Sequence, residues 1–306
     1  MYPDDAQDAE TLLGAALQAQ RLARSQTGQQ RLLLRHEILG HTNGGTLSFE
    51  AHLQQALQRD EFFLVYQPQQ HLADGHISAV EALLRWRHAS RGVVSPAEFI
   101  PLLEESGQIV DVGDWVIGEA CRQLAEWQRA GLHLRMSINL SAVQFNQPDF
   151  PQRIMEHVNA YRLLPKQLEL EITESAAMGH PEQTLKMLLE LKDLGFSIAI
   201  DDFGTGHSTF NYLLRFPIDT LKIDRSFTNS VTEERSSRTI VRSLTTLSQG
   251  LGFKTIAEGV ETQRQRDYLE ALDVDEIQGF WLAKPMTADR LGTFVASIGR
   301  RLCQPR

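Results

Sequence analysis

From Leu47 onward, short β-branched or aromatic runs alternate with longer segments of helical periodicity. Strands that alternate with helices are typical of parallel sheets, because each parallel connection has to cross the sheet. The eight runs are 61–69, 77–86, 134–140, 168–173, 197–202, 220–224, 254–258 and 276–280. Eight strands with helical crossovers predict an α/β fold, a closed (β/α)8 barrel of the TIM type rather than an open sheet.

The connection between the first two runs differs from the others. Segments 114–130, 181–194 and 234–250 are each long enough for a crossover helix, whereas only seven residues, 70–76, join the first run to the second. A parallel crossover needs about a dozen residues or more. We therefore expect the first strand to run antiparallel to the second. A helix over 48–60, capped by Ser48, is predicted to lead into the barrel.

Charge and cysteine content limit the partners and the compartment. The chain has 306 residues and a net charge of −9, which disfavours binding to a nucleic-acid polymer or an anionic membrane. Two cysteines, Cys121 and Cys303, suit a reducing compartment and exclude a disulfide framework. No apolar run reaches the roughly 18 residues of a membrane helix, and the acidic start does not resemble a signal peptide. A cytoplasmic location is predicted for this region.

Polar side chains recur near the carboxyl ends of the predicted strands, where barrels of this type carry their catalytic groups. They are Glu81, Asn139, Glu171, Asp201 with Asp202, Lys222, Glu258 and Gln278. Singly, each has a simpler explanation: an Asp pair before Gly204 is typical of a turn, and a lone lysine is usually a surface charge. Their recurrence at seven successive strand ends favours one shared site. Period two also places Arg85 on the same strand face as Glu81.

The charges of this set indicate what it binds. Its five carboxylates and one ammonium leave four negative charges, which two divalent cations would neutralise. Oxygen ligands favour Mg²⁺ or Mn²⁺ over zinc, and the sequence has no HExxH or CxxC pairing. Two such ions imply hydrolysis at phosphorus, with a metal-bound water as the nucleophile.

The segment Glu81-Ala82-Leu83-Leu84-Arg85-Trp86 resembles the motif that names the EAL-domain phosphodiesterases of bacteria, which cut cyclic di-GMP to linear pGpG. The resemblance runs from about Ser48 to Ser297. Its further motifs are 66–68, 138–141, 171–174, 201–206, 221–224, 258–261 and 278–280. The resemblance implies a barrel with an antiparallel first strand, in agreement with the short connection.

The resemblance also implies roles for individual residues. One ion would be held by Glu81, Asn139, Glu171 and Asp201, and the other by Asp201, Asp202 and Glu258. Calcium is expected to bind without supporting turnover. Lys222 and Gln278 would orient or polarise the attacking water and the phosphate, and Glu174 would hold the loop 202–209. The implied substrate contacts are Gln67, Leu84, Arg85, Asn139, Asp202 and Pro285.

Several features lie outside this core of the resemblance. His207, Thr209 and Trp281 depart from the family pattern, and the roles of His207 and Trp281 stay open. Arg135 and Glu169 are predicted to form a structural ion pair below the site. The helix after Gly206 is similar to one that forms homodimer contacts in the family, although core packing would explain it equally well.

The N-terminal segment carries a second resemblance. Its alanine-rich helix and the residues after Gly28 resemble the end of a GGDEF, or diguanylate cyclase-like, domain. This implies a boundary between a remnant at 1–46 and an EAL domain at 47–306, within a longer protein with a GGDEF-like domain ahead of this one. Whether that longer protein is tethered to a membrane stays open.

Two other functions fit parts of this pattern. A receptor would bind cyclic di-GMP through Arg85 and Gln67 without cutting it, but such receptors lack several acids that this sequence retains. An enolase-like lyase also places carboxylates at strand ends, but it needs a base over a carbon acid, for which Lys222 is the sole inward candidate. The phosphodiesterase interpretation is preferred.

Overall fold

The computed structural model describes residues 45–204 and 210–302, and the chain divides into two units, Met1–Ala56 and Leu57–Arg306. In the first unit the described element is the helix α3 (Gly45–Ala56). The predicted bounds of this helix are wrong. It begins at Gly45, so Ser48 lies in its first turn rather than at its N-cap, and it stops before a turn in which Asp60 adopts a left-handed φ of 54°. The predicted GGDEF-like remnant lies, apart from its last two residues, outside the described part of the chain.

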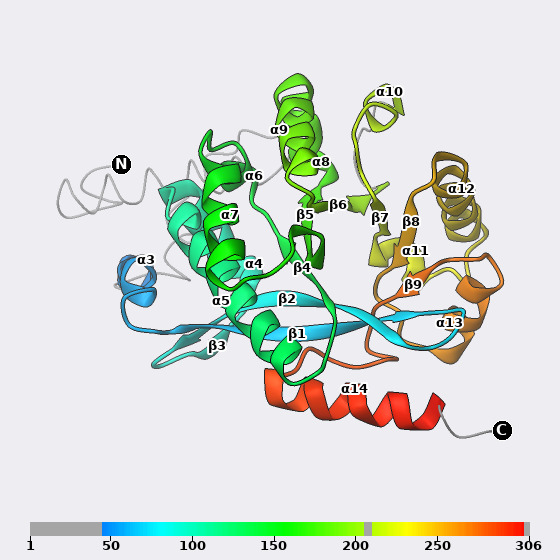
Figure 1. Cartoon of the computed structure of the whole chain (residues 1–306), viewed down its shortest axis with the longest axis horizontal. Coiled ribbons are helices and arrows are strands. Elements are labelled where there is room, and N and C mark those ends of the chain that lie inside the picture. Colours follow the sequence, from blue (N-terminus) through cyan, green and yellow to red (C-terminus); the bar gives the residue numbers. More distant parts are fainter. Residues whose placement is uncertain (1–44, 205–209, 303–306) are drawn as a thin grey trace, which may run out of the picture. The chain divides into compact units, whose positions relative to one another are not determined.

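The second unit is built on one nine-stranded sheet that closes into a barrel (Figure 1). Its strands are β1 (Phe62–His71), β2 (Ile77–His88), β3 (Gly92–Val94), β4 (Arg135–Asn139), β5 (Leu168–Thr173), β6 (Ser197–Phe203), β7 (Thr220–Ile223), β8 (Lys254–Ala257) and β9 (Glu276–Ile277). The order is β1-β9-β8-β7-β6-β5-β4-β2-β3, and β1 also pairs with β2, which closes the ring. The predicted eight-stranded barrel is confirmed, because β3 only extends the edge of β2.

The strand directions follow from the connection lengths. Strand β1 pairs antiparallel with β2, with Gln67 opposite Glu81, and antiparallel with β9, with His71 opposite Glu276. The neighbours from β2 through β4 to β9 are parallel. The expected antiparallel first strand is therefore confirmed. Strand β3 was not predicted, because three residues are too few to show an alternating pattern.

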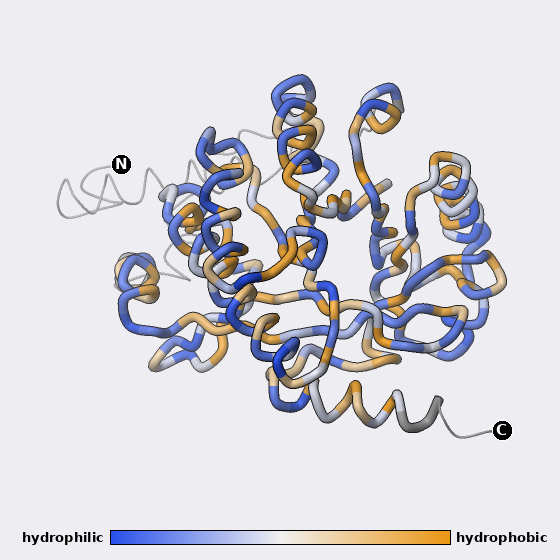
Figure 2. Tube along the Cα trace, viewed as in Figure 1, coloured by the Kyte–Doolittle hydropathy of each residue, from blue (hydrophilic) through white to orange (hydrophobic). Residues whose placement is uncertain are grey.

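Helices connect the parallel strands, and a further helix follows the last strand. They are α4 (Pro96–Ser106), α5 (Ile109–Arg129), α6 (Ala142–Phe145), α7 (Phe150–Ala160), α8 (Glu174–Gly179), α9 (Pro181–Asp193), α10 (Phe210–Leu213), α11 (Arg225–Asn229), α12 (Arg235–Leu251), α13 (Gln263–Glu270) and α14 (Ala288–Leu302), with a 3₁₀ turn, η1, at Pro165–Gln167. Helices α5, α9 and α12 match the three predicted crossovers. Each carries both hydrophilic and hydrophobic residues, as expected for helices that bury one side (Figure 2). No helix in the described ranges has the length and apolar character needed to span a membrane.

The two faces of the barrel wall have different chemistry. Val80 and Trp86 on β2 are fully buried on the outer face, where the Trp86 ring packs edge-on against Phe99 of α4 at 5.8 Å between centroids. The inner face at the amino end is polar. Arg135 contacts Glu169 (Nε to Oε1, 3.4 Å) and Glu276 (Nη2 to Oε2, 2.9 Å), so the predicted ion pair is confirmed with a third member.

This polar layer forms the floor beneath the strand ends. Ser137 and Thr220 donate hydrogen bonds to the two carboxylate oxygens of Glu169, at 3.1 and 2.7 Å. A buried carboxylate is costly unless it is paired and hydrogen-bonded. Glu169 meets both conditions, although among the described residues Arg135 Nε makes an ion-pair contact and no hydrogen bond. The floor is thus a charged network, nearly fully hydrogen-bonded, beneath the strand ends.

Candidate functional site

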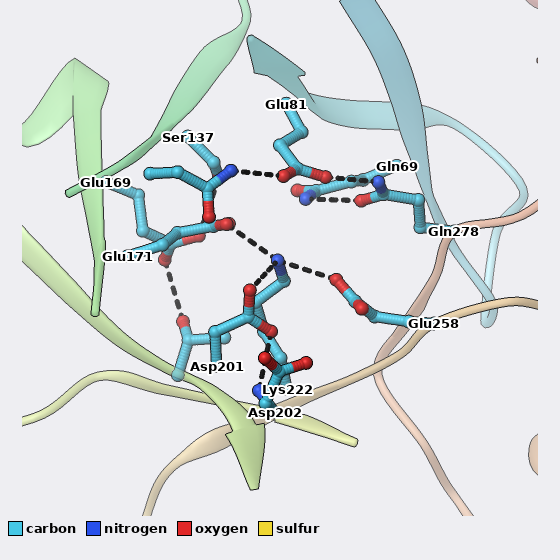
Figure 3. Close-up of polar contacts among 12 residues, drawn as sticks. Gln69, Glu81, Ser137, Glu169, Glu171, Asp201, Asp202, Lys222, Glu258 and Gln278 are labelled. Atoms are coloured by element: carbon cyan, nitrogen blue, oxygen red, sulfur yellow. Dashed lines mark hydrogen bonds and ion pairs between the residues drawn. The ribbon is translucent and has the colours of Figure 1, made fainter. Parts of the chain in front are cut away.

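Lys222 of β7 lies at the centre of the predicted site (Figure 3). Its side chain is fully buried. The ammonium Nζ lies 2.6 Å from Glu171 Oε2, 2.6 Å from Glu258 Oε1 and 3.3 Å from Asp201 Oδ2. An ammonium has three N–H donors, so these three carboxylates can satisfy it. Lys222 thereby gathers acids from β5, β6 and the end of β8.

Burial and crowding set the protonation of this cluster. Burial disfavours the Lys222 ammonium, but Asp201, Glu171 and Glu258 outweigh it and raise the pKa of Lys222 well above its ordinary value. Burial raises the pKa of Glu258 to about 8, against the attraction of Lys222, and raises that of Glu171 as well. Burial, reinforced by Asp201, raises the pKa of Asp202 to about 6. The cluster without cations therefore binds protons near neutral pH.

A second group, next to the Lys222 cluster, joins Glu81 to a chain of amides. Glu81 accepts hydrogen bonds from Asn139 Nδ2 at 2.5 Å and from Gln278 Nε2. Gln278 Nε2 also lies 3.1 Å from Gln67 Oε1, and Gln69 Nε2 donates to Gln278 Oε1 at 2.9 Å. Both the oxygen and the nitrogen of the Gln278 side-chain amide are thus hydrogen-bonded, which fixes the orientation of the amide.

Gln69 was missed in the sequence analysis. It is fully buried, and its Oε1 has no hydrogen-bond partner among the described residues. The signal was available, because Gln67 and Gln69 share the inward face of β1 by period two. Its importance becomes visible only once the antiparallel register sets Gln67 opposite Glu81 and the barrel closes β9 against β1.

Asp201 and Asp202 both contribute to the site because β6 is irregular at its end. In a regular strand, adjacent side chains point to opposite faces. Here the pairing register shifts between Ile200 and Phe203, Asp202 adopts a left-handed φ of 54°, and its N–H donates to Asp201 Oδ1 at 2.8 Å. Carboxylate oxygens of Asp201, Asp202 and Glu258 consequently lie within 4.8 Å of one another. A bulge that redirects a side chain is common beside active sites.

Glu174 holds the chain directly after this irregular end. It is buried at the start of α8, and its Oε2 accepts a hydrogen bond from the Gly204 N–H at 2.8 Å. Gly204 has a φ of 98°, and a Cβ there would lie 3.0 Å from the Phe227 ring. Gly204 belongs to the loop 202–209 that Glu174 was predicted to hold, so the contact lies at the expected position. Residues 205–209, including His207 and Thr209, lie outside the described ranges.

A close backbone contact sets Glu258 beside Gln278. The Val260 N–H donates to Gln278 O at 3.1 Å, and Trp281 N–H donates to Val260 O at 2.9 Å. A Cβ on Gly279 would lie 2.2 Å from Val260 O, so only glycine fits between these segments. This contact brings together the chain after β8 and the chain after β9, which carry two of the predicted catalytic residues.

The donors present fit divalent cations. Asp201, Asp202 and Glu258 present a compact set of carboxylate oxygens. Within the part of the chain that the structure describes, Glu171 Oε1 is buried without a hydrogen-bond partner. An unsatisfied buried carboxylate oxygen is costly unless something binds it. Oxygen ligands of this kind suit Mg²⁺ or Mn²⁺.

Three predicted substrate contacts lie apart from these hydrogen bonds. The Arg85 guanidinium donates to Leu84 O at 2.8 Å, and burial lowers its pKa while Glu81 opposes the shift. Leu84 follows the opposite parity on β2 and is half-buried, as is Pro285. Gln67, by contrast, takes part in the amide chain through its Oε1 and also reaches the segment before Pro285, because its Nε2 donates to Ala283 O at 3.1 Å.

Comparisons with known proteins show what this chain is similar to. The family model described as EAL domain matches residues 50–285. The bifunctional diguanylate cyclase/cyclic di-GMP phosphodiesterase MucR of Pseudomonas aeruginosa is 38% identical over 297 residues, which cover 97% of this chain and 43% of that protein. The cyclic di-GMP phosphodiesterase PA2567 of the same species is 39% identical over 240 residues, which cover 78% of this chain and 41% of that protein. The chain thus spans less than half the length of these relatives.

Solved structures show the same fold. The PaMucR phosphodiesterase in complex with c-di-GMP superposes with a TM-score of 0.78 at 40% identity, over 80% of this chain and 99% of that one. The FimX EAL domain from Pseudomonas aeruginosa bound to c-di-GMP gives a TM-score of 0.71 at 28% identity, over 77% of this chain and 95% of that one.

Proposed function

Because this chain belongs to the EAL domain family, we propose that it hydrolyses one phosphodiester bond of cyclic di-GMP to give linear pGpG. The observation that carries the proposal is the gathering of Glu171, Asp201 and Glu258 around the buried Lys222, beside Glu81 and Gln278. The relatives named as cyclic di-GMP phosphodiesterases and the neighbour bound to c-di-GMP support the substrate class.

We propose further that two Mg²⁺ or Mn²⁺ ions bind here. One would be held by Glu81, Asn139, Glu171 and Asp201, and the other by Asp201, Asp202 and Glu258. When bound, such ions lower the pKa of an attacking water and offset the charge of the phosphodiester. The unpartnered Glu171 Oε1 and the close oxygens of the second set support this assignment.

The chain's own residues would position the substrate and stabilise charge. Lys222 supplies a fixed cation for the charge that develops on the phosphoryl oxygens. Gln278, held by Gln69 and Glu81, presents an amide of fixed orientation to the water and the phosphate. Arg85 donates bidentate hydrogen bonds to phosphate oxygens.

The remaining predicted residues would surround these groups. Gln67, Leu84, Asn139, Asp202 and Pro285 contact the substrate. Glu174 keeps the end of β6 in place through Gly204.

The decisive experiment is a turnover assay on the full chain. We expect conversion of cyclic di-GMP to pGpG with Mg²⁺ or Mn²⁺, none after chelation, and binding without turnover in Ca²⁺. Glu171→Ala should lower turnover by at least ~10³-fold, because it removes a catalytic metal position. The matched control is Glu156→Ala, at an exposed position on α7. Tight binding without product under any metal would instead establish a receptor.

The partners and surroundings of the chain form a separate part of the proposal. We propose that the chain forms a homodimer and follows a GGDEF-like domain in a longer protein, with the boundary near residue 46, and that this region is cytoplasmic. The bifunctional name of MucR and the buried free Cys121 support the last two points. Light scattering on the purified chain tests the dimer, which a monomeric mass at micromolar concentration would exclude.

A further inference from the structure

The turn between β1 and β2 brings two histidines and an aspartate together. His71 Nδ1 lies 3.0 Å from Asp74 Oδ1, and His76 Nδ1 lies 2.5 Å from the same oxygen. The two imidazole centroids are 5.3 Å apart. One potential ligand atom from each residue lies within 4.8 Å of those of the other two. This group shares no residue with the acid cluster around Lys222.

Backbone hydrogen bonds hold the turn in this shape. His71 N–H donates to His76 O at 3.0 Å, and Gly75 N–H donates to His71 O at 2.9 Å. The φ of 73° at Gly75 is one that glycine adopts readily. His76 N–H also donates to Asp74 Oδ1 at 3.2 Å, which directs the carboxylate toward the imidazoles. The backbone of the turn and the Asp74 carboxylate are thus held in place before any ligand binds.

We propose that His71, Asp74 and His76 form a binding site for one Zn²⁺-like transition-metal ion, separate from the proposed Mg²⁺ or Mn²⁺ site. Two imidazoles and one carboxylate suit zinc and its neighbours in the first row, whereas the all-oxygen set around Lys222 suits harder cations. Three protein ligands leave one position of a tetrahedral ion for water.

The distances allow the ion to enter with little rearrangement. Ligands bound at about 2.0–2.1 Å in a tetrahedral sphere lie roughly 3.3 Å apart. The observed 3.0 and 2.5 Å contacts need only widen by less than about 1 Å, and all three side chains are partly exposed. In a neutral imidazole the proton can reside on Nε2, which frees Nδ1 as a ligand.

The proposed site lies next to the contact between β1 and β9, where the barrel closes. The turn lies at the amino end of β2, whereas the acids lie toward the carboxyl ends of the parallel strands. His71 pairs with Glu276 of β9, and Leu72 N–H donates to Asp275 O at 2.9 Å. These contacts close the barrel between β1 and β9. An ion bound at this turn would stabilise the closure from the end opposite the acids.

The experiment uses the full chain without a polyhistidine tag, stripped of metal and kept in excess Mg²⁺ so that the acids are occupied. One equivalent of Cu²⁺ serves as the spectroscopic probe, and Zn²⁺ is titrated against a chromogenic chelator. We expect nitrogen hyperfine couplings in the electron paramagnetic resonance spectrum of the wild type. His71→Ala and His76→Ala should each lose couplings and weaken Zn²⁺ at least ~10-fold, and Asp74→Asn should weaken Zn²⁺ as well. The control His180→Ala, at an exposed position elsewhere, should match the wild type.

Melting temperatures provide the second readout. Zn²⁺ should raise the melting temperature of the wild type and of His180→Ala by mass action, and leave His76→Ala unchanged. Equal melting temperatures of the metal-free variants will establish that they fold. Absence of nitrogen ligation in the wild type, or wild-type Zn²⁺ affinity in both His71→Ala and His76→Ala, would overturn the proposal. Neither result bears on cyclic di-GMP turnover, so this proposal and the proposed function fail separately.

Discussion

Lys222 is the residue whose charge organises the acids. Its ammonium contacts three carboxylates, from β5, from β6 and from the residue after β8, and its pKa is raised because those carboxylates surround it. A fixed ammonium here favours any state in which more negative charge develops nearby. It should therefore act more on the transition state than on substrate binding.

Replacing Lys222 tests this distinction. We expect Lys222→Met, which retains most of the side-chain volume, to lower kcat by about 100-fold or more while KM changes less than about threefold. Steady-state kinetics with Mn²⁺ measure both constants, and a melting curve with Mn²⁺ checks the fold. A raised KM at unchanged kcat would assign Lys222 to substrate binding instead.

Gln69 is expected to act through Gln278. Gln69→Leu removes the donor to Gln278 Oε1, so the amide is held only through its Nε2, by Glu81 and Gln67, and its orientation is less restrained. Loss of one such hydrogen bond corresponds to up to about 1.5 kcal/mol, or roughly a tenfold fall in kcat. The control Gln70→Leu, whose side chain donates to Gly75 O in the β1–β2 turn instead of to Gln278, should retain kcat. Full activity of Gln69→Leu would show that Gln278 does not depend on it.

At the scale of elements, the end of β6 is the most specialised segment. A register shift, a left-handed Asp202 and a glycine at 204 replace regular strand geometry, and Glu174 at the start of α8 holds the result in place. Left-handed backbone at a non-glycine residue costs on the order of 1–3 kcal/mol. The hydrogen bond from Gly204 to Glu174 opposes that cost.

Glu174 variants separate this restraint from charge. Glu174→Ala removes the acceptor for Gly204, so we expect cation affinity at Asp202 to fall by about tenfold or more. Glu174→Gln keeps an oxygen acceptor and should stay near the wild type. Calorimetric titration with Mn²⁺ measures the cation affinity of both variants. Equal losses in the two variants would mean that the charge of Glu174, and not its hydrogen bond, matters.

At the scale of the whole molecule, protonation of the acid cluster couples pH to stability. In the metal-free fold the pKa of Glu258 is about 8 and that of Asp202 about 6, both above ordinary values. Acids with a raised pKa favour the folded state when protonated, so their contribution is complete below the ordinary pKa and is lost as pH rises through the folded-state pKa. Divalent cations compete with the same protons.

We therefore expect the melting temperature of the metal-free chain to fall, relative to that of the Mn²⁺-loaded chain, as the pH rises from about 5 to 8. The gap between the two should widen with pH, and the apparent Mn²⁺ affinity should rise over the same window. Scanning fluorimetry at several pH values, with EDTA or Mn²⁺, measures the gap. In Asp202→Asn the widening between pH 5 and 7 should be smaller. A gap that stays constant would contradict coupling between these acids and the cations.

The amino-acid order alone was enough for the barrel, the antiparallel first strand and the acids at strand ends. These follow from local periodicity, from connection length and from residue type, which are properties of neighbouring residues. It was not enough for the bounds of α3, the short β3, the role of Gln69, or the joint use of Asp201 and Asp202. The role of Gln69 and the joint use of Asp201 and Asp202 depend on contacts between segments far apart in the chain, such as β1 with β9, and on a backbone angle held by such contacts. Strand β3 is instead a local hairpin with β2 that is too short to show an alternating pattern. The raised pKa values belong to the same group, because burial and the distances between charges exist only once the chain has folded.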